Sequence, residues 1–409
     1  MITIEHPSII LKKGEAFLQA VLNDDKRNKQ ILVWYSVQEH YGTFLCDDRA
    51  DAFLIVALMY AMKSHQDIAV EAPVSKRLLF NIENVIQPLF SKMIPGSRCI
   101  TISVQGGSCP ILDGKAVGCG CSLGVDSLSA LYKHMSDHMM EEYRVSHLAL
   151  FNSCQLGYLN PELDESAFRE AVESLAPFSK EVNLPVVAVN SNLNVFYAEA
   201  GFTTASSRFV ISTLSCVLAL QKLFGKYVFA SSCPVDSFEL SQKDQSHAEA
   251  AYVPLLSTES TEIILSGSTL TRVEKTDQIR HNHLTQRYLD VCWATQVASS
   301  ISHDDRWLKE KTKKNCGWCD KCLRTLFTLE LLGEDLQRYG ELFDLSKYYS
   351  HKGAFVKTVI LNRHKKHMYM EVYNLMSEKN YIIPRSVLFS VWMSRIKRMA
   401  KKILRFFNL

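Results

Sequence analysis

From Lys115 onward, short apolar runs alternate with longer stretches that have helical spacing. The apolar runs are AVGCGC, SHLALFN, LPVVAVN and KYVFASS. Alternation of this kind is typical of a parallel sheet that binds ligands beyond the carboxyl ends of its strands. The sequence therefore predicts an α/β fold with a doubly wound parallel sheet. The loops after Cys121, Asn152, Asn190 and Ser231 should line one crevice.

Changes of pattern along the chain predict three segments. Residues 1–113 form a mixed α/β region with a strand at KQILVWYS, a further strand at ITISV and a buried helix at Ala52–Met62. By position, this region is expected to shape substrate choice. Residues 114–335 form the core with the sites described below, and residues 336–409 form a helical, basic extension.

Composition excludes several classes of protein. A net charge of +3 and a pI near 8.2 are too mild to indicate nucleic-acid binding across the whole chain. The start of the chain lacks the basic and apolar regions of a secretory signal. Twelve cysteines in such a chain favour reduced thiols and metal ligation over disulfides, which predicts a cytoplasmic location.

A tight polar turn separates the AVGCGC strand from the helix predicted at Leu128–Tyr143. Such a turn directs backbone N–H groups and the helix amino end toward one point, which attracts an anion. Serine hydroxyls add donors, and Asp126 can hold Mg²⁺ through oxygen, as a polyphosphate ligand requires. An ordinary helix cap is the structural alternative. The turn comprises Cys121, Ser122, Leu123, Gly124, Val125, Asp126 and Ser127.

Three cysteines follow much later with the spacing C-x-x-C-x-x-C, at Cys316, Cys319 and Cys322. This spacing puts three thiolates within reach of one ion, and tetrahedral Zn²⁺ takes a fourth ligand, for which Cys292 is the candidate. The stretch between Cys292 and Cys316 is polar and is predicted to be a loop. The alternatives are an iron–sulfur cluster, a sulfur-carrying thiol pair or unrelated cysteines.

The motif SLGVDS is similar to the SGGxDS loop of the PP-loop ATP pyrophosphatases, which grips the pyrophosphate portion of ATP. A PP-loop followed by C-x-x-C-x-x-C resembles the 7-cyano-7-deazaguanine synthase branch, over residues 117–332. The resemblance implies an adenine nucleotide alpha hydrolase-like fold and adenylation of a carboxylate by ATP, with AMP then displaced by ammonia. Leu123 departs from the family's first glycine, and Cys292 lies farther from the triplet than the branch's fourth ligand does.

Other candidate residues flank these motifs. The resemblance places adenine and ribose at Phe151 and Asn152; for Asn152 an ordinary loop position is the alternative. Arg208 can reach a phosphate with its planar fork, or it can form an ion pair within the fold. Arg272 and Lys275 put two cations on one short segment that could neutralise departing pyrophosphate, and a solvated helix start is the alternative.

The tail from Ser386 to Leu409 mixes apolar residues with arginines and lysines and contains no acid. A basic amphipathic helix of this kind fits an anionic membrane surface or an acidic partner, and the alternative is a helix docked on its own domain.

Three functions remain open. The leading hypothesis is an ATP-dependent ligase that uses ATP, Mg²⁺ and structural Zn²⁺ and adenylates a carboxylate or amide oxygen of a small-molecule or peptide acid. An amine or ammonia then displaces AMP. The second is sulfur transfer to RNA or a small molecule. The third, motivated by Leu123, is a degenerate scaffold that binds nucleotide without turnover. A homodimer is the expected assembly.

Overall fold

The computed structural model describes residues 1–406 apart from 108, 154–160, 203–206, 241–243 and 293–311. The chain forms two compact units. Among the described residues, the first unit comprises Met1–Ser122 and Asp126–Thr269. The second comprises Leu123–Val125 together with residues 270–292 and 312–406. The sheet belongs to the first unit, and the cysteine-rich segment belongs to the second.

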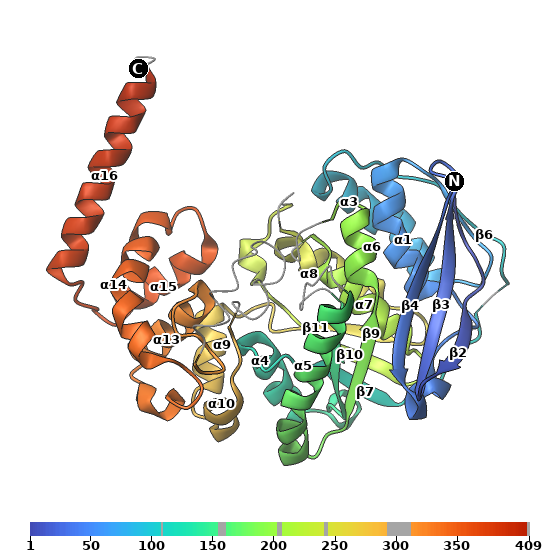
Figure 1. The fold of residues 1–409 in the computed structure, drawn as a ribbon, viewed down its shortest axis with the longest axis horizontal. Helices are drawn as coiled ribbons and strands as arrows, with labels where there is room; N and C mark the ends of the chain where they lie inside the picture. Colours follow the sequence, from blue (N-terminus) through green and yellow to red (C-terminus); the bar gives the residue numbers. More distant parts are fainter. Residues whose placement is uncertain (108, 154–160, 203–206, 241–243, 293–311, 407–409) are drawn as a thin grey trace. The chain divides into compact units, whose positions relative to one another are not determined.

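A large, mostly parallel sheet forms the centre of the first unit (Figure 1). Five neighbouring strands run parallel, with β7 flanked by β8 and then β9 on one side, and by β10 and then β11 on the other. The predicted α/β class with a parallel sheet is therefore confirmed. The five strands are β7 (Ala116–Gly120), β8 (His147–Phe151), β9 (Val186–Ser191), β10 (Phe224–Ala230) and β11 (Glu262–Ser266).

Strands from the amino-terminal region extend the same sheet. The order continues from β9 through β4, β3, β1 and β5 to β6, and β2 pairs with β3. One continuous apolar core includes residues from this region and from the parallel strands. The predicted segments 1–113 and 114–335 thus share a sheet and a core. The added strands are β1 (Ile2–Ile4), β2 (Ser8–Lys12), β3 (Glu15–Asp24), β4 (Lys29–Gln38), β5 (Ile68–Val70) and β6 (Ile102–Val104).

Helix α1 (Asp51–Ser64) is buried from Asp51 to Met62, because its sequence is apolar on nearly every side. It packs against α7 (Phe209–Leu218), which is also buried beyond its first residue. The predicted buried helix is confirmed. Other helices of this unit are α2 (Lys76–Asn81), α3 (Gln87–Met93), α4 (Val125–Met135), α5 (Pro161–Val182), α6 (Leu193–Glu199) and α8 (Glu249–Tyr252).

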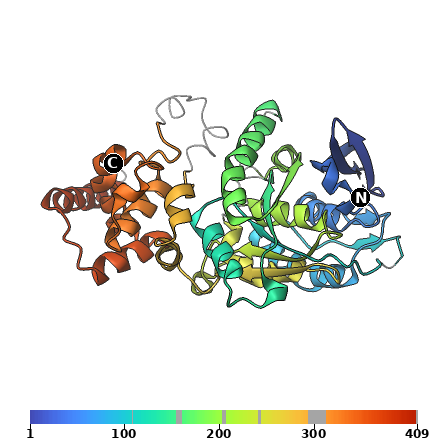
Figure 2. The same ribbon diagram turned by 90° about the horizontal axis from the view of Figure 1, so that it is seen from below.

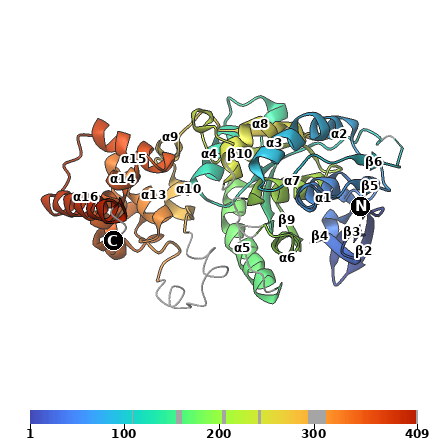
Figure 3. The same cartoon turned by 90° about the horizontal axis from the view of Figure 1, so that it is seen from above.

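The described part of the second unit is helical. Helix α13 packs against α14, α15 and α9, and α16 contacts α14 and extends beyond the other helices of this unit (Figure 1). Figures 2 and 3 show the same ribbon from below and from above. Within the described residues, no helix has the length and apolar character needed to span a bilayer. The helices are α9 (Arg272–Ile279), α10 (His283–Tyr288), α13 (Asp320–Leu331), α14 (Leu345–Asn362), α15 (His367–Glu378) and α16 (Arg385–Phe406).

Candidate functional site

The predicted phosphate-binding turn lies between β7 and α4. Strand β7 ends at Gly120 and α4 begins at Val125, so residues 121–124 connect a central strand to a helix. The N–H of Cys121 donates to the carbonyl oxygen of Ala149 on β8 at 2.9 Å, which continues the parallel pairing. The turn therefore starts at the carboxyl end of β7, between the ends of β8 and β10.

Polar side chains cluster at the start of α4. The exposed Ser122 places its hydroxyl 3.3 Å from that of the buried Ser127, and Asp126 is partly buried in the first helical turn. First-turn N–H groups have no acceptor within their own helix, and this end of a helix dipole is positive. The arrangement is chemically suited to a phosphate, with a carboxylate beside it for a divalent cation.

Leu123 adopts the left-handed backbone conformation, with φ at +58°. This region suits glycine and is strained for a residue with a Cβ atom. The side chain of Leu123 is only 3% exposed, and its carbonyl oxygen accepts a hydrogen bond of 2.9 Å from the N–H of Asp290, which belongs to the same unit. Leucine at this position therefore keeps the backbone conformation that glycine would provide, while its side chain is buried.

The segment after β10 adds groups that the sequence did not reveal. Glu249 is 1% exposed, and its Oε1 accepts hydrogen bonds from the Ser231 hydroxyl at 2.6 Å and from the Cys233 N–H at 3.1 Å. The N–H of Ser231 also donates to the carbonyl oxygen of Ser266 at the end of β11. Glu249 thus fixes the loop after β10, and no motif around it marked that role.

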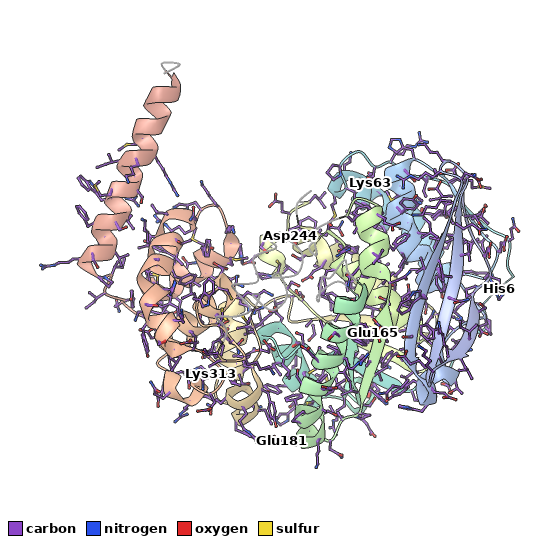
Figure 4. The ribbon with its side chains drawn as sticks, viewed as in Figure 1. His6, Lys63, Glu165, Glu181, Asp244 and Lys313 are labelled. Atoms are coloured by element: carbon purple, nitrogen blue, oxygen red, sulfur yellow. The ribbon has the colours of Figure 1, made fainter. Side chains whose placement is uncertain are left out.

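The thiol of Cys233 lies among negative charges in this loop. Burial, with the charges of Glu249, Asp244 (labelled in Figure 4) and Asp126, raises the pKa of Cys233 to about 12, against a lowering effect of its hydrogen bond with Ser246. Because the thiol stays protonated at neutral pH, Cys233 is a poor nucleophile.

Alkylation should separate Cys233 from an exposed thiol. At pH 8, iodoacetamide is expected to modify Cys233 on the order of a thousandfold more slowly than exposed Cys99, because the thiolate is the reacting form. Peptide mass spectrometry over time measures both rates. The raised pKa of Cys233 favours the folded state below the ordinary thiol value near 9, and this contribution is lost as pH rises toward 12. Equal rates for both thiols in the folded protein would contradict the prediction.

Asn152 follows β8 and is completely buried. Its Nδ2 donates to Oδ1 of Asn190 at 2.8 Å, and its Oδ1 accepts from Nδ2 of Asn194 at 3.2 Å. The Ser191 hydroxyl donates to the carbonyl oxygen of Asn152 at 2.5 Å. These bonds tie the ends of β8 and β9 together. Asn190 and Asn194 are fold-determining partners that sequence reasoning did not assign.

Phe151 and Arg208 are also engaged within the first unit. The Phe151 ring stacks on Tyr227 with centroids 5.9 Å apart, and the side chain is 8% exposed. Arg208 is 3% exposed, and its Nη1 donates to the carbonyl oxygen of Asn194 at 2.8 Å. Phe151 therefore packs on β10 and Arg208 binds the backbone of α6, and their contact with a nucleotide stays a prediction.

Arg272 and Lys275 lie on α9 in the second unit. A capping box starts this helix: the Glu274 N–H donates to Thr271 Oγ1 at 3.2 Å and the Thr271 N–H donates to Glu274 Oε2 at 2.7 Å. The Arg272 N–H donates to Oε2 of Glu371 at 3.0 Å. Lys275 is 2% exposed, which is unusual because lysine is seldom fully buried. The alternative interpretation, a solvent-exposed start of a helix, therefore does not hold for Lys275.

The four predicted zinc ligands come together in the second unit. The sulfur atoms of Cys292, Cys316, Cys319 and Cys322 all lie within 4.8 Å of one another. Sγ of Cys316 is 3.9 Å from Sγ of Cys322. Zinc–sulfur bonds of about 2.3 Å place tetrahedral sulfurs about 3.8 Å apart, so the cluster fits one zinc ion. Residues 293–311, most of the predicted loop between Cys292 and Cys316, lie outside the described residues.

Backbone N–H groups point at the cluster sulfurs. The Cys316 N–H donates to Sγ of Cys292 at 3.5 Å, and the Cys319 N–H donates to Sγ of Cys316 at 3.3 Å. Such bonds stabilise thiolates. Gly317 permits this turn, because its φ is +78° and a Cβ atom there would lie 2.0 Å from the carbonyl oxygen of Asp344. The backbone of the turn from Cys316 to Cys319 thus stabilises negatively charged sulfur.

The cluster is electrostatically coupled. Hydrogen bonds with the other three cysteines lower the pKa of Cys292. Hydrogen bonds with Cys292, Cys316 and Cys319 raise the pKa of Cys322. Buried thiolates repel one another, so several cannot ionise together unless a cation compensates them. A divalent ion would supply that charge, and nearby Lys314 instead pairs with Asp290 at 3.8 Å.

Asn315 joins the two segments that carry the ligands. It is 0% exposed; its Nδ2 donates to the carbonyl oxygen of Leu289, and its Oδ1 accepts from the Val291 N–H, both at 2.8 Å. The Asn315 N–H also donates to the carbonyl oxygen of Leu342 at 2.8 Å. One buried amide therefore holds Cys292 beside the triplet.

Asn315→Ala is expected to weaken metal retention without removing a ligand. The substitution leaves a buried carbonyl oxygen at Leu289 and a buried N–H at Val291 without their partner, which costs about 1–3 kcal/mol for each group. In competition with a chelator, Asn315→Ala should release its metal at a chelator concentration at least about tenfold lower than the wild type needs. Asn282→Ala removes a helix-capping amide elsewhere in this unit and serves as the control. Unchanged retention in Asn315→Ala would contradict the role of the clamp.

The structure thus brings the four cysteines together and places the turn from Cys121 to Ser127 after β7. Cys121, Ser122, Asp126 and Ser127 belong to the first unit, as do Phe151, Asn152 and Arg208, whereas Leu123–Val125 belongs to the second. Arg272 and Lys275 also belong to the second unit. Comparison with models of protein families, with curated proteins and with solved structures finds no match to this chain.

Proposed function

We propose that this chain is a PP-loop enzyme that adenylates a carboxylate or amide oxygen with ATP and then transfers the activated group to an amine or ammonia. The observation that carries the proposal is the position of the SLGVDS turn. It follows β7, where the strand order reverses between β8 and β10, and ligands of doubly wound sheets bind at such a reversal. We further propose the doubly wound PP-loop fold on this basis.

Leu123 supports a working loop. The main difference from the SGGxDS pattern is this leucine, and its φ of +58° keeps the conformation that the missing glycine would allow. Because the side chain is buried, it leaves the exposed Ser122 and the start of α4 as the surface offered to a phosphate. This favours the enzyme over the degenerate scaffold.

In the proposed reaction, the substrate oxygen attacks the α-phosphorus of ATP, and the bond to the β-phosphate oxygen breaks. Pyrophosphate leaves with that electron pair, and the amine then attacks the activated carbon and expels AMP. Positioning and charge stabilisation are the protein's contribution. The turn's N–H groups and Ser122 bind phosphate, and Asp126 would hold the Mg²⁺ that offsets polyphosphate charge. Arg272 and Lys275 belong to the second unit, and their role toward the departing pyrophosphate stays a prediction from the sequence.

The cysteine cluster is proposed to hold structural Zn²⁺. Four cysteine sulfurs, buried or partly buried, would fill all four positions of a tetrahedral zinc ion and leave none for a substrate, as expected for a structural site. Sulfur transfer would need a reactive thiol beside the loop, and the raised pKa of Cys233 disfavours that residue. We place the reaction in the cytoplasm, because none of the described cysteines forms a disulfide.

Pyrophosphate release tests the proposal. Purified protein with Mg-ATP, an amine and a pool of small carboxylic acids and peptides with free carboxylates should release pyrophosphate and AMP in equal amounts. When amines are omitted, mass spectrometry should find an adenylate. Release of ADP or inorganic phosphate would indicate a different ATPase. Nucleotide binding without any pyrophosphate would favour the degenerate scaffold, and no nucleotide binding would end the assignment.

A further inference from the structure

Helix α16 has a composition unlike the rest of the chain. Its residues from Arg385 to Phe406 include no aspartate or glutamate. Apolar residues, among them Trp and Phe, dominate its first half, and six of its seven basic residues lie between Arg395 and Arg405. At about 1.5 Å per residue it is about 33 Å long. The basic residues are Arg385, Arg395, Lys397, Arg398, Lys401, Lys402 and Arg405.

One side of α16 docks on its own unit. Val387 and Val391 are 7% and 5% exposed. Val387 packs beside Gly353 of α14, where an added Cβ atom would lie 3.6 Å from Val387 Cγ2. Nη1 of Arg398 donates to the carbonyl oxygen of Leu361 at 3.3 Å. The helix is therefore fixed to α14 from Val387 to Arg398, as the docked-helix alternative predicts, but this contact uses one side only.

Another side of α16 exposes large apolar residues. Leu388, Phe389, Trp392 and Met399 are 49%, 63%, 56% and 58% exposed. The rings of Phe389 and Trp392 lie 5.9 Å apart and form one aromatic surface. Helical periodicity places Leu388, Trp392 and Met399 within about 40° of one another around the axis. These four residues form an apolar stripe that is interrupted by exposed Arg395 between Trp392 and Met399, and so many exposed large apolar side chains are unusual for a water-facing surface.

Basic residues flank the apolar stripe. By the same periodicity, exposed Arg395 lies about 20° from Leu388, and exposed Lys397 lies about 80° beyond Phe389 on the other side. Positive charge beside Trp and Phe is the pattern of a helix that lies in a membrane interface, where the rings enter the acyl boundary and the bases meet lipid phosphates. An acidic protein surface would match the charges but offers no apolar phase for four large side chains.

We propose that α16 binds the surface of an anionic lipid bilayer, lying parallel to it with the Leu388–Met399 stripe inserted. The opposite side of α16 contacts α14 and holds the helix so that the stripe faces away from α14. This inference does not depend on the proposed adenylation. It adds a location for the protein's activity, whatever that activity is, at an anionic membrane surface.

Vesicle sedimentation with the full chain tests the proposal. The protein should sediment with phosphatidylcholine vesicles that contain phosphatidylglycerol, sediment poorly with phosphatidylcholine alone, and dissociate as salt screens the lipid charge. Phe389→Ser/Trp392→Ser should weaken binding at least about tenfold. Arg395→Gln/Lys397→Gln should weaken it about thirtyfold at low salt. Brominated acyl chains should quench Trp392 fluorescence in the wild type and lose that share of quenching in Trp392→Phe.

Matched substitutions in the other unit are the controls. Phe80→Ser/Ile111→Ser removes two exposed apolar residues, and Lys12→Gln/Lys92→Gln removes two exposed charges. Both should bind vesicles like the wild type. Equal binding to neutral and anionic vesicles would overturn the proposal. So would vesicle binding that polyglutamate abolishes while Phe389→Ser/Trp392→Ser leaves it unchanged, because that result would indicate an acidic protein partner.

Discussion

Cys322→Ser protein is expected to purify without its metal ion and with a second unit that no longer unfolds cooperatively. Cys322 is 0% exposed and lies among three other sulfurs. A structural zinc site contributes about 10–16 kcal/mol to folding in small zinc domains. That range is as large as the total stability of a typical domain, about 5–15 kcal/mol. Loss of one ligand should therefore unfold the cluster and the segments that it joins.

Elemental analysis by mass spectrometry measures this result, with about one zinc per wild-type chain and none in Cys322→Ser. Cys99→Ser is the matched control, because Cys99 is an exposed thiol outside the cluster and its variant should keep both metal and melting temperature. A colourless wild-type solution separates zinc from an iron–sulfur cluster. Full metal content in Cys322→Ser would refute the four-sulfur site.

Asp126→Asn is expected to lower the rate of Mg-ATP-dependent pyrophosphate release at least about a hundredfold. The amide keeps the shape of the side chain and removes the negative charge that would hold Mg²⁺ beside the phosphates. Because Asp126 lies in the first turn of α4, the loss of a favourable charge–dipole contact should lower stability only by about 0.3–1 kcal/mol. Activity should therefore fall far more than stability does.

A pyrophosphate assay and a thermal melt on the same preparation measure the two effects. Asp137→Asn is the control, since Asp137 is an exposed carboxylate just beyond the other end of α4. Raising the Mg²⁺ concentration should restore part of the activity of Asp126→Asn if metal affinity is the cause. Wild-type rates in Asp126→Asn would remove Asp126 from the mechanism and leave the turn without its proposed role.

Local sequence patterns located most of the central elements. The runs KQILVWYS, AVGCGC, SHLALFN, LPVVAVN and KYVFASS correspond to β4, β7, β8, β9 and β10, and part of ITISV to β6. Apolar composition and flanking turns suffice for β7 to β10, because none of their residues is exposed. The pattern did not locate β1–β3, β5 or β11. It also placed the helix at Leu128–Tyr143, whereas α4 begins at Val125 and ends at Met135.

The candidate sites divide in the same way. Spacing alone identified Cys316, Cys319 and Cys322, and the structure confirms that Cys292 completes the group. Asn315, which holds Cys292 in place, carried no signal, because its two partners lie more than twenty residues away. Glu249 and Asn194 were missed for the same reason: a buried hydrogen bond between distant segments leaves no periodic trace.

Patterns of short range therefore established the α/β class, the cysteine ligands, the strand–turn–helix at Ser122 and the basic character of the tail, because each depends on residues near one another in the chain. The order of the strands, the left-handed backbone of Leu123, the burial of Lys275 and the outward face of Trp392 emerged only in three dimensions. Each of these depends on which distant segment occupies the neighbouring space, and close packing, rather than local preference, makes that choice.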